Sequence, residues 1–155
     1  MVNNYMSFLK DYSEELGNIT GISSVVISQI EQQFKLTLPL AYKQFLQLLG
    51  ESTGSFMKGY YMNYPYLLDN KQDADCALNF DNRKHNIIII KDQYFFFGQW
   101  QGYNFFYFDC SEESEDPPVY VLTDTPKTYQ YKSSFTTFLR EEGLTPLLES
   151  KSKFQ

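Results

Sequence analysis

The chain has 155 residues, the size of one ordinary domain, and we expect a single domain over residues 1–155 with one hydrophobic core. Its 19 Asp and Glu against 13 Lys and Arg give a net charge of -6, which argues against a nucleic-acid backbone or an anionic membrane as the direct partner and favours a basic protein. Aromatic residues make up 18% of the chain, enough to supply a ring-rich core, an interface, or both.

Two helices are predicted before residue 35. The first covers residues 4–16, and Gly17 follows its last apolar residue. Its apolar face consists of Tyr5, Phe8, Leu9, Tyr12 and Leu16. After a turn-rich break, Ser23 or Ser24 can cap the second helix. That helix carries Ile27, Ile30 and Phe34 on one face.

An extended link and a third helix follow. Residues 35–38 alternate polar and apolar, and Pro39 disfavours helical backbone before it, so Leu36 and Leu38 should both face inward. Pro39 also suits the first position of a helix. The apolar face of this helix consists of Tyr42, Phe45, Leu46 and Leu49. We expect Gly50 to end it in a left-handed conformation.

The middle of the chain is rich in tyrosine. Residues 56–62 favour a short strand, although Gly59 weakens it. Around Pro65 lie Tyr60, Tyr61, Tyr64 and Tyr66. These rings either pack on the sheet or form a recognition surface, since Tyr offers a large contact area for few frozen rotamers. Residues 67–81 predict a solvated helix or loop, because their aspartates lack the spacing of a calcium loop.

Several strands are predicted next. Residues 87–90 are four isoleucines, typical of a strand buried on both faces. Residues 94–97 and 105–108 predict an aromatic hairpin. Its loop, residues 98–104, presents Trp100, which either enters the core or forms an exposed contact at the rim of the sheet. A further strand, residues 119–122, follows Pro117 and Pro118.

The chain closes with helices. Ser133 or Ser134 can cap one that carries Phe135, Phe138 and Leu139 and ends at Gly143, and residues 146–152 can form a short last helix. Helices therefore flank consecutive strands instead of alternating with them. This order predicts an α+β domain in which a mainly antiparallel, twisted sheet packs in two layers against N-terminal and C-terminal helices.

Three groups of residues, in this order, resemble the SUKH superfamily, which includes bacterial immunity proteins and a fungal cell-wall regulator. The first group is Ile30-Glu31, Phe34, Leu36, Leu38-Pro39, Tyr42-Lys43, Phe45-Leu46 and Gly50. The second is Phe95-Phe96-Phe97-Gly98 with Phe105 to Asp109, and the third is Ser134-Phe135-Thr136-Thr137-Phe138-Leu139. The resemblance spans roughly residues 24–142 and implies the same two-layer α+β architecture.

The sequence offers little that could catalyse a reaction. His85, the sole histidine, lies among polar residues before a strand and is expected to be solvated. Cys76 and Cys110 are far apart and form no CxxC pair, so we expect neither a disulfide nor a zinc site. No phosphate-binding glycine loop, nucleophile elbow or HExxH motif occurs. We therefore expect no enzyme, no cofactor and no metal, and a hydrolase that uses only carboxylates ranks last.

The protein is expected to be cytoplasmic. No run of residues approaches the roughly 18 apolar residues of a membrane span. The N-terminus is acidic where a signal peptide would be basic and then apolar.

An acidic segment, residues 111–126, stands out because it carries no base. Its acids are Glu112, Glu113, Glu115, Asp116 and Asp124. It is either an ordinary solvated loop or a patch that attracts a basic partner.

The resemblance implies an immunity protein that binds a cognate toxin domain, often a nuclease, and neutralises it by occlusion. The alternative is a regulatory interaction scaffold like the fungal members. The acids expected to steer the basic toxin are Glu112, Glu113, Glu115 and Asp116. The anchors expected to slow its release are Trp100, Tyr103, Tyr61 and Tyr64.

Overall fold

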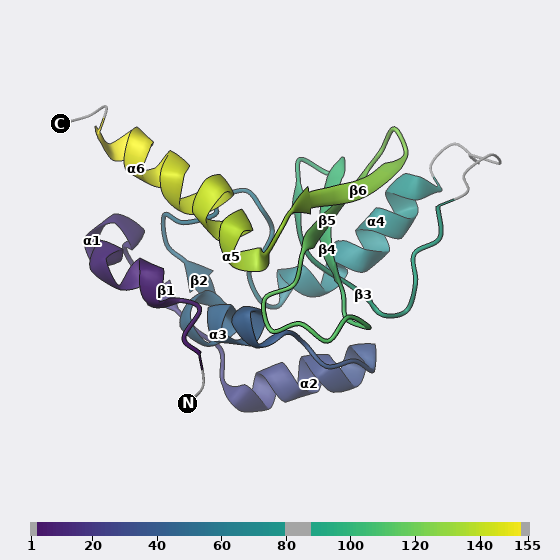
Figure 1. Ribbon diagram of the computed structural model, residues 1–155, viewed down its shortest axis with the longest axis horizontal. Helices are drawn as coiled ribbons and strands as arrows, with labels where there is room; N and C mark the ends of the chain where they lie inside the picture. The colour runs from purple at the N-terminus through teal and green to yellow at the C-terminus, as the bar shows by residue number, and fades with distance from the viewer. Residues whose placement is uncertain (1–2, 80–87, 153–155) are drawn as a thin grey trace.

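A four-strand antiparallel sheet in the order β3-β4-β5-β6 forms the centre of the molecule in the computed structural model, which describes residues 3–79 and 88–152 (Figure 1). Its strands are β3 (Tyr94–Trp100), β4 (Asn104–Asp109), β5 (Val119–Thr123) and β6 (Lys127–Lys132). Consecutive strands are joined as hairpins, so the α+β class and the antiparallel sheet are confirmed.

Helices and a small second sheet precede the central sheet. In chain order they are η1 (Ser7–Tyr12), α1 (Ser13–Leu16), β1 (Ile19–Thr20), α2 (Ser24–Phe34), α3 (Leu40–Leu49), β2 (Ser52–Thr53), η2 (Tyr66–Asp69) and α4 (Asn70–Leu78). After the sheet come α5 (Phe135–Phe138), the π-helical turn η4 (Leu139–Leu144) and α6 (Thr145–Ser152). Figure 1 shows α6 running from the sheet toward α1, and the two helices are in contact.

The two faces of the sheet pack against different helices because successive strand residues point in opposite directions. One face joins α3 and α5 in the main core through Phe95, Phe97, Phe106, Phe108, Val119 and Val121. The other face forms a smaller cluster with Ala74 and Leu78 of α4. Its strand residues are Phe96, Phe105, Tyr107 and Leu122.

Stacked and edge-on rings fill the main core. Phe97 lies 4.5 Å from Phe108 between ring centroids, and Tyr42 of α3 contacts both strands as well as Phe135 of α5. The Tyr42 hydroxyl is buried and has no hydrogen-bond partner among the described residues. Much of the aromatic content is therefore used in packing.

The predicted helices form with changed details. Residues 4–16 are a 3₁₀ segment and one α-helical turn instead of a continuous helix, although Leu9 and Leu16 are buried as expected. Ser23 caps α2, its hydroxyl accepting from the Val26 N–H at 3.2 Å. Pro39 is the extended residue before α3 and not its first helical residue.

Two glycines have roles other than those predicted. Gly50 has right-handed backbone, and its missing side chain matters because a Cβ would lie 2.5 Å from the Leu46 carbonyl oxygen. A left-handed residue is found instead at the end of α2, where Lys35 is the C-cap. Gly143 does not end the helix that begins at Phe135, because helical backbone continues through η4 into α6. A Cβ at Gly143 would lie 2.5 Å from the Met57 sulfur.

Three strand predictions need correction. Residues 56–59 form turns and residues 60–62 have no helix or strand, and Met57, Gly59 and Tyr61 all have positive φ. Residues 88–90 lie outside any strand, with Ile89 75% exposed, while Ile87 is outside the described residues. β6 is not among the predicted strands, because its residues are polar and mostly exposed and lack the buried alternation of a core strand.

The two edges of the sheet differ. The Gln99 N–H of β3 donates to the Tyr60 carbonyl oxygen at 2.8 Å, so the loop before α4 lies along this edge. At the other edge, β6 carries Lys127 and Lys132, charges that discourage pairing with another strand. The loop that holds the predicted tyrosines is therefore fixed beside β3.

Candidate partner-binding surface

Trp100 lies at the tip of the β3–β4 hairpin, half-buried. Its ring centroid is 4.8 Å from that of Tyr60. Gly59 leaves room for the indole, since a Cβ there would lie 2.9 Å from Trp100 Cζ3. The Tyr103 N–H donates to the Trp100 carbonyl oxygen at 3.2 Å. Trp100 thus combines the two predicted alternatives, because one part packs on the core cluster and the rest is open to solvent.

Three tyrosines near this tip are exposed. The exposed fractions of Tyr61, Tyr66 and Tyr103 are 57%, 63% and 40%. Tyr64 is half-buried and packs against the main core, and its N–H donates to the Gly50 carbonyl oxygen at 2.7 Å. We call Tyr61, Tyr66, Trp100 and Tyr103 the aromatic surface. Tyr66 was not among the residues selected as anchors from the sequence.

A buried polar network supports the aromatic surface from below. The Gln99 amide nitrogen donates to the side-chain oxygens of Asn70 at 2.9 Å and Asp73 at 2.8 Å. The Asn70 amide nitrogen donates in turn to the Tyr61 carbonyl oxygen at 3.1 Å. Asn70 and Gln99 are both buried. Because buried polar groups are costly when unpaired, this network fixes α4, β3 and the Tyr61 backbone relative to one another.

Glu142 joins the rings beneath Trp100 to the last helices. Its carboxylate accepts hydrogen bonds from the hydroxyls of Tyr60 and Tyr131. Burial and the negative charge of Glu142 raise the pKa of both tyrosines far above the usual range. Both hydroxyls are therefore neutral donors at neutral pH, and they hold Tyr60 in place under the indole.

Two residues of the acidic segment make hydrogen bonds to other elements of the fold. The Asp116 carboxylate accepts from the Thr136 N–H at 3.0 Å and from the Thr136 hydroxyl at 2.5 Å, at the start of α5. Glu115 accepts from the Ala41 N–H of α3 through its carbonyl oxygen at 2.8 Å, and from the Tyr5 hydroxyl through its carboxylate at 2.8 Å. A negative charge at a helix N-terminus is favourable.

Glu112 and Glu113 are exposed, and the Glu112 carboxylate accepts from the Tyr120 hydroxyl at 3.1 Å. Both follow the end of β4 at Asp109, whereas Trp100 pairs with Asn104 at the other end. The rise per residue of about 3.4 Å places these ends roughly 17 Å apart. The structure therefore separates the predicted anchors from the predicted steering acids.

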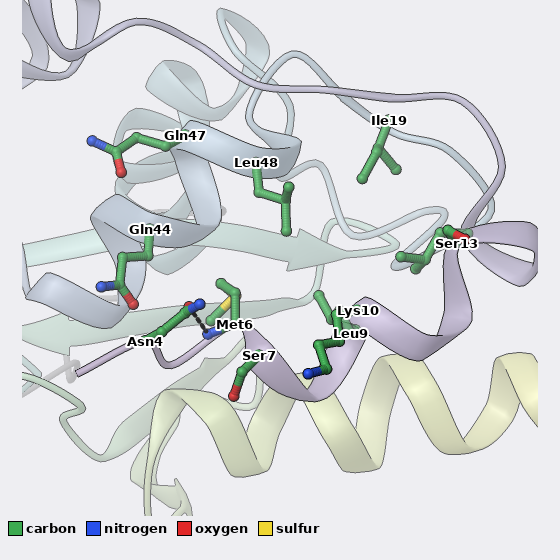
Figure 2. Close-up of a pocket in the computed structure, with 11 residues that line it drawn as sticks. Asn4, Met6, Ser7, Leu9, Lys10, Ser13, Ile19, Gln44, Gln47 and Leu48 are labelled. Carbon is green, nitrogen blue, oxygen red and sulfur yellow. Dashed lines mark hydrogen bonds between the residues drawn. The ribbon is translucent and has the colours of Figure 1, made fainter. Parts of the chain in front are cut away.

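A pocket of about 570 Å³ lies between the N-terminal segment and α3 (Figure 2). Side chains of α3, β1 and the N-terminal segment surround it, with Lys10 as the charged member. The Gln44 amide bonds the backbone of Asn3 and Tyr5 at 2.7 and 2.8 Å and so fastens this segment to α3. No site residue predicted from the sequence lines the pocket.

The thiols and acids show no reactive arrangement within residues 3–79 and 88–152. Burial, and secondarily the charge of Asp109, raises the pKa of the Cys110 thiol to about 12, so it is protonated at neutral pH. Cys76 is exposed and unpaired. No cluster of three potential metal ligands occurs in this part of the chain. His85 lies outside the described residues.

Comparison with known protein families matches residues 21–141 to the SMI1 / KNR4 family (SUKH-1). The match covers α2 through α5 with the whole central sheet. Comparison with curated proteins gives no match. Among the described residues, no helix has both the length and the apolar character needed to cross a membrane.

Proposed function

Since this chain belongs to the SMI1 / KNR4 family (SUKH-1), we propose that it is an immunity protein, which binds the toxin domain of a cognate toxin and neutralises it by occlusion. The toxin domain is a basic nuclease. The protein acts in the cytoplasm and catalyses no reaction.

The aromatic surface is the observation that carries this proposal. The Asn70 amide fixes the Tyr61 backbone and Tyr60 packs against the Trp100 ring, so the backbone at Tyr61 and the Trp100 side chain lose little conformational freedom when a partner covers this surface. Tyr and Trp are enriched among residues that dominate binding energy. Rings supported in this way favour a role as contact residues over a role in packing alone.

Charge supports a basic partner. Nuclease clefts are electropositive because they bind phosphates, and this chain has a net charge of -6 with Glu112 and Glu113 exposed. A standard interface of about 800 Å² per partner is about 30 Å across. One interface can therefore reach the aromatic surface and the acids roughly 17 Å away along the sheet.

The test begins by searching the neighbouring genes for one that encodes a toxin domain, which is then expressed with this protein. Co-expression of the two should restore growth, and the purified proteins should elute as one complex in size-exclusion chromatography. Failure to protect and to form a complex, with both proteins folded, would reject the immunity role. Capture of host signalling proteins instead would favour the regulatory scaffold.

A further inference from the structure

A small pocket opens on the aromatic surface between Tyr61 and Tyr66. Its volume is about 290 Å³, and Gly59 and Asn63 complete the lining. Pockets for drug-sized ligands range from about 300 to 1,000 Å³. This pocket therefore has the size to accept one side chain of a partner protein.

The loop that forms the pocket is held in an uncommon conformation. Within five residues, Met57, Gly59 and Tyr61 have φ angles of 55°, 87° and 53°. Non-glycine residues rarely adopt such angles, and they persist where surrounding contacts impose them. The contacts here are the Asn70 hydrogen bond to the Tyr61 carbonyl oxygen and the Trp100 ring against Gly59. The pocket is thus pre-formed by residues of α4 and β3.

Asn63 supplies a hydrogen-bond acceptor to the pocket. The Asn63 amide nitrogen donates to the Glu51 carbonyl oxygen at 3.1 Å. None of the described residues donates to the Asn63 amide oxygen, which remains available to a ligand. The lining carries no charge, and the charged residues of the surrounding segment 51–70 are Glu51, Lys58 and Asp69.

We infer that this pocket binds an arginine side chain of the partner, with the guanidinium against the rings of Tyr61 and Tyr66 and one N–H donated to the Asn63 amide oxygen. Arginine stacks on aromatic faces and is weakly hydrated, so it enters such a site more readily than lysine. The net charge of -6 favours a cation over an acidic side chain. The inference rests on the proposed function for the identity of the partner, and it names the group that the partner inserts.

The first test needs no toxin. N-acetyl-arginine amide and its uncharged analogue N-acetyl-citrulline amide are titrated into the ¹⁵N-labelled full-length protein. The arginine compound should shift the amide signals of Tyr61, Asn63 and Tyr66, and the citrulline compound should shift them far less. Equal shifts with both compounds, or no arginine-dependent shift at these residues, would overturn the assignment.

The second test uses the complex with the toxin domain. Tyr66→Ala should raise the dissociation rate roughly tenfold, whereas Tyr66→Phe, which keeps the ring, should change it less than about threefold. Tyr61→Ala is the second variant, and melting curves confirm the fold of each. Dissociation from both alanine variants at the wild-type rate would refute the arginine pocket while leaving the immunity role intact. If wild-type protein fails to bind the toxin, the immunity role fails and the arginine titration still decides the pocket.

Discussion

At the scale of single residues, Tyr42 combines ideal packing with an unsatisfied hydroxyl. Its ring lies among Phe95, Phe97 and Phe108, but its oxygen has no hydrogen-bond partner among residues 3–79 and 88–152, and burial raises the pKa of the hydroxyl far above its usual range. Tyr42→Phe should therefore raise the free energy of unfolding by about 1 kcal/mol in urea titrations. Tyr60→Phe, which loses the bond to Glu142, is the matched control and should lower it. A lower free energy of unfolding in Tyr42→Phe would contradict this prediction, because it would mean that the Tyr42 hydroxyl has a hydrogen-bond partner.

Asp116 is expected to stabilise the fold by holding the start of α5. Asp116→Ala removes both hydrogen bonds to Thr136 and should cost about 1 to 2 kcal/mol, the range of lost helix caps. Glu113→Ala, an exposed acid of the same loop, should change stability by less than about 0.5 kcal/mol. Equal effects in thermal unfolding would contradict the capping role.

The Cys110 thiol gives a prediction about pH. Its folded pKa of about 12 lies above the value of about 8.5 for a free thiol, so unfolding releases a proton at alkaline pH. The stability that depends on this thiol is complete below about pH 8 and is lost as pH rises toward 12. At pH 8, iodoacetamide should modify Cys76 long before Cys110. Equal modification in mass spectrometry of the native protein would show that Cys110 is accessible and ionised.

At the scale of elements, local chemistry predicts some features well. The Ser23 cap and the Ser134 cap each depend on residues within a few positions, and each is found. The segment 56–62 could not be predicted in this way. Its conformation depends on Trp100 and Asn70, which are distant in the sequence.

The candidate surface was only partly predictable for the same reason. The tyrosine content near Pro65 leaves open whether the rings pack on the sheet or form a recognition surface, and the structure has both, with Tyr66 exposed and Tyr64 half-buried. The separation of Glu112 from Trp100 follows from the direction and length of β4. The aromatic pattern predicts the β3–β4 hairpin, but it does not show which other loops of the chain lie beside each end of that hairpin.

Gly143 is a test of how tightly the last helix packs. Gly143→Ala places a methyl group 2.5 Å from the Met57 sulfur and the Phe56 ring, and should cost about 1 to 3 kcal/mol as overpacking does. In Gly102→Ala the new methyl meets no atom within 4 Å, so only the positive φ of 77° opposes it, at about 1 kcal/mol. If Gly143→Ala lowers the free energy of unfolding less than Gly102→Ala does in urea titrations, the helix at Gly143 moves to make room for the methyl group.

At the scale of the whole molecule, the described segments outside the matched region pack against it or against each other. The N-terminal segment is fastened to α3 by Gln44, α1 contacts α6, and the Arg140 guanidinium lies 4.8 Å from the centroid of the Phe8 ring. These contacts use neither the side chains of the aromatic surface nor those of Glu112 and Glu113. The aromatic surface and the acids remain uncovered by them, as a binding role requires.

The binding role also predicts that the two ends of the sheet affect different rate constants. Exposed acids should govern how fast a basic partner arrives, and the aromatic surface should govern how slowly it leaves. Asp116 is left unchanged in such a test because it holds α5.

Surface plasmon resonance against the purified toxin domain, at low salt and at 0.15 M salt, measures both rates directly. Glu112→Lys with Glu113→Lys should slow association roughly tenfold at low salt, with a smaller effect at 0.15 M, where the screening length is about 8 Å. Trp100→Ala should instead raise the dissociation rate with little change in association. Two results together would contradict this assignment and place the interface elsewhere. The charge-reversed variant would associate at the wild-type rate at both salt concentrations, and Trp100→Ala would dissociate at the wild-type rate.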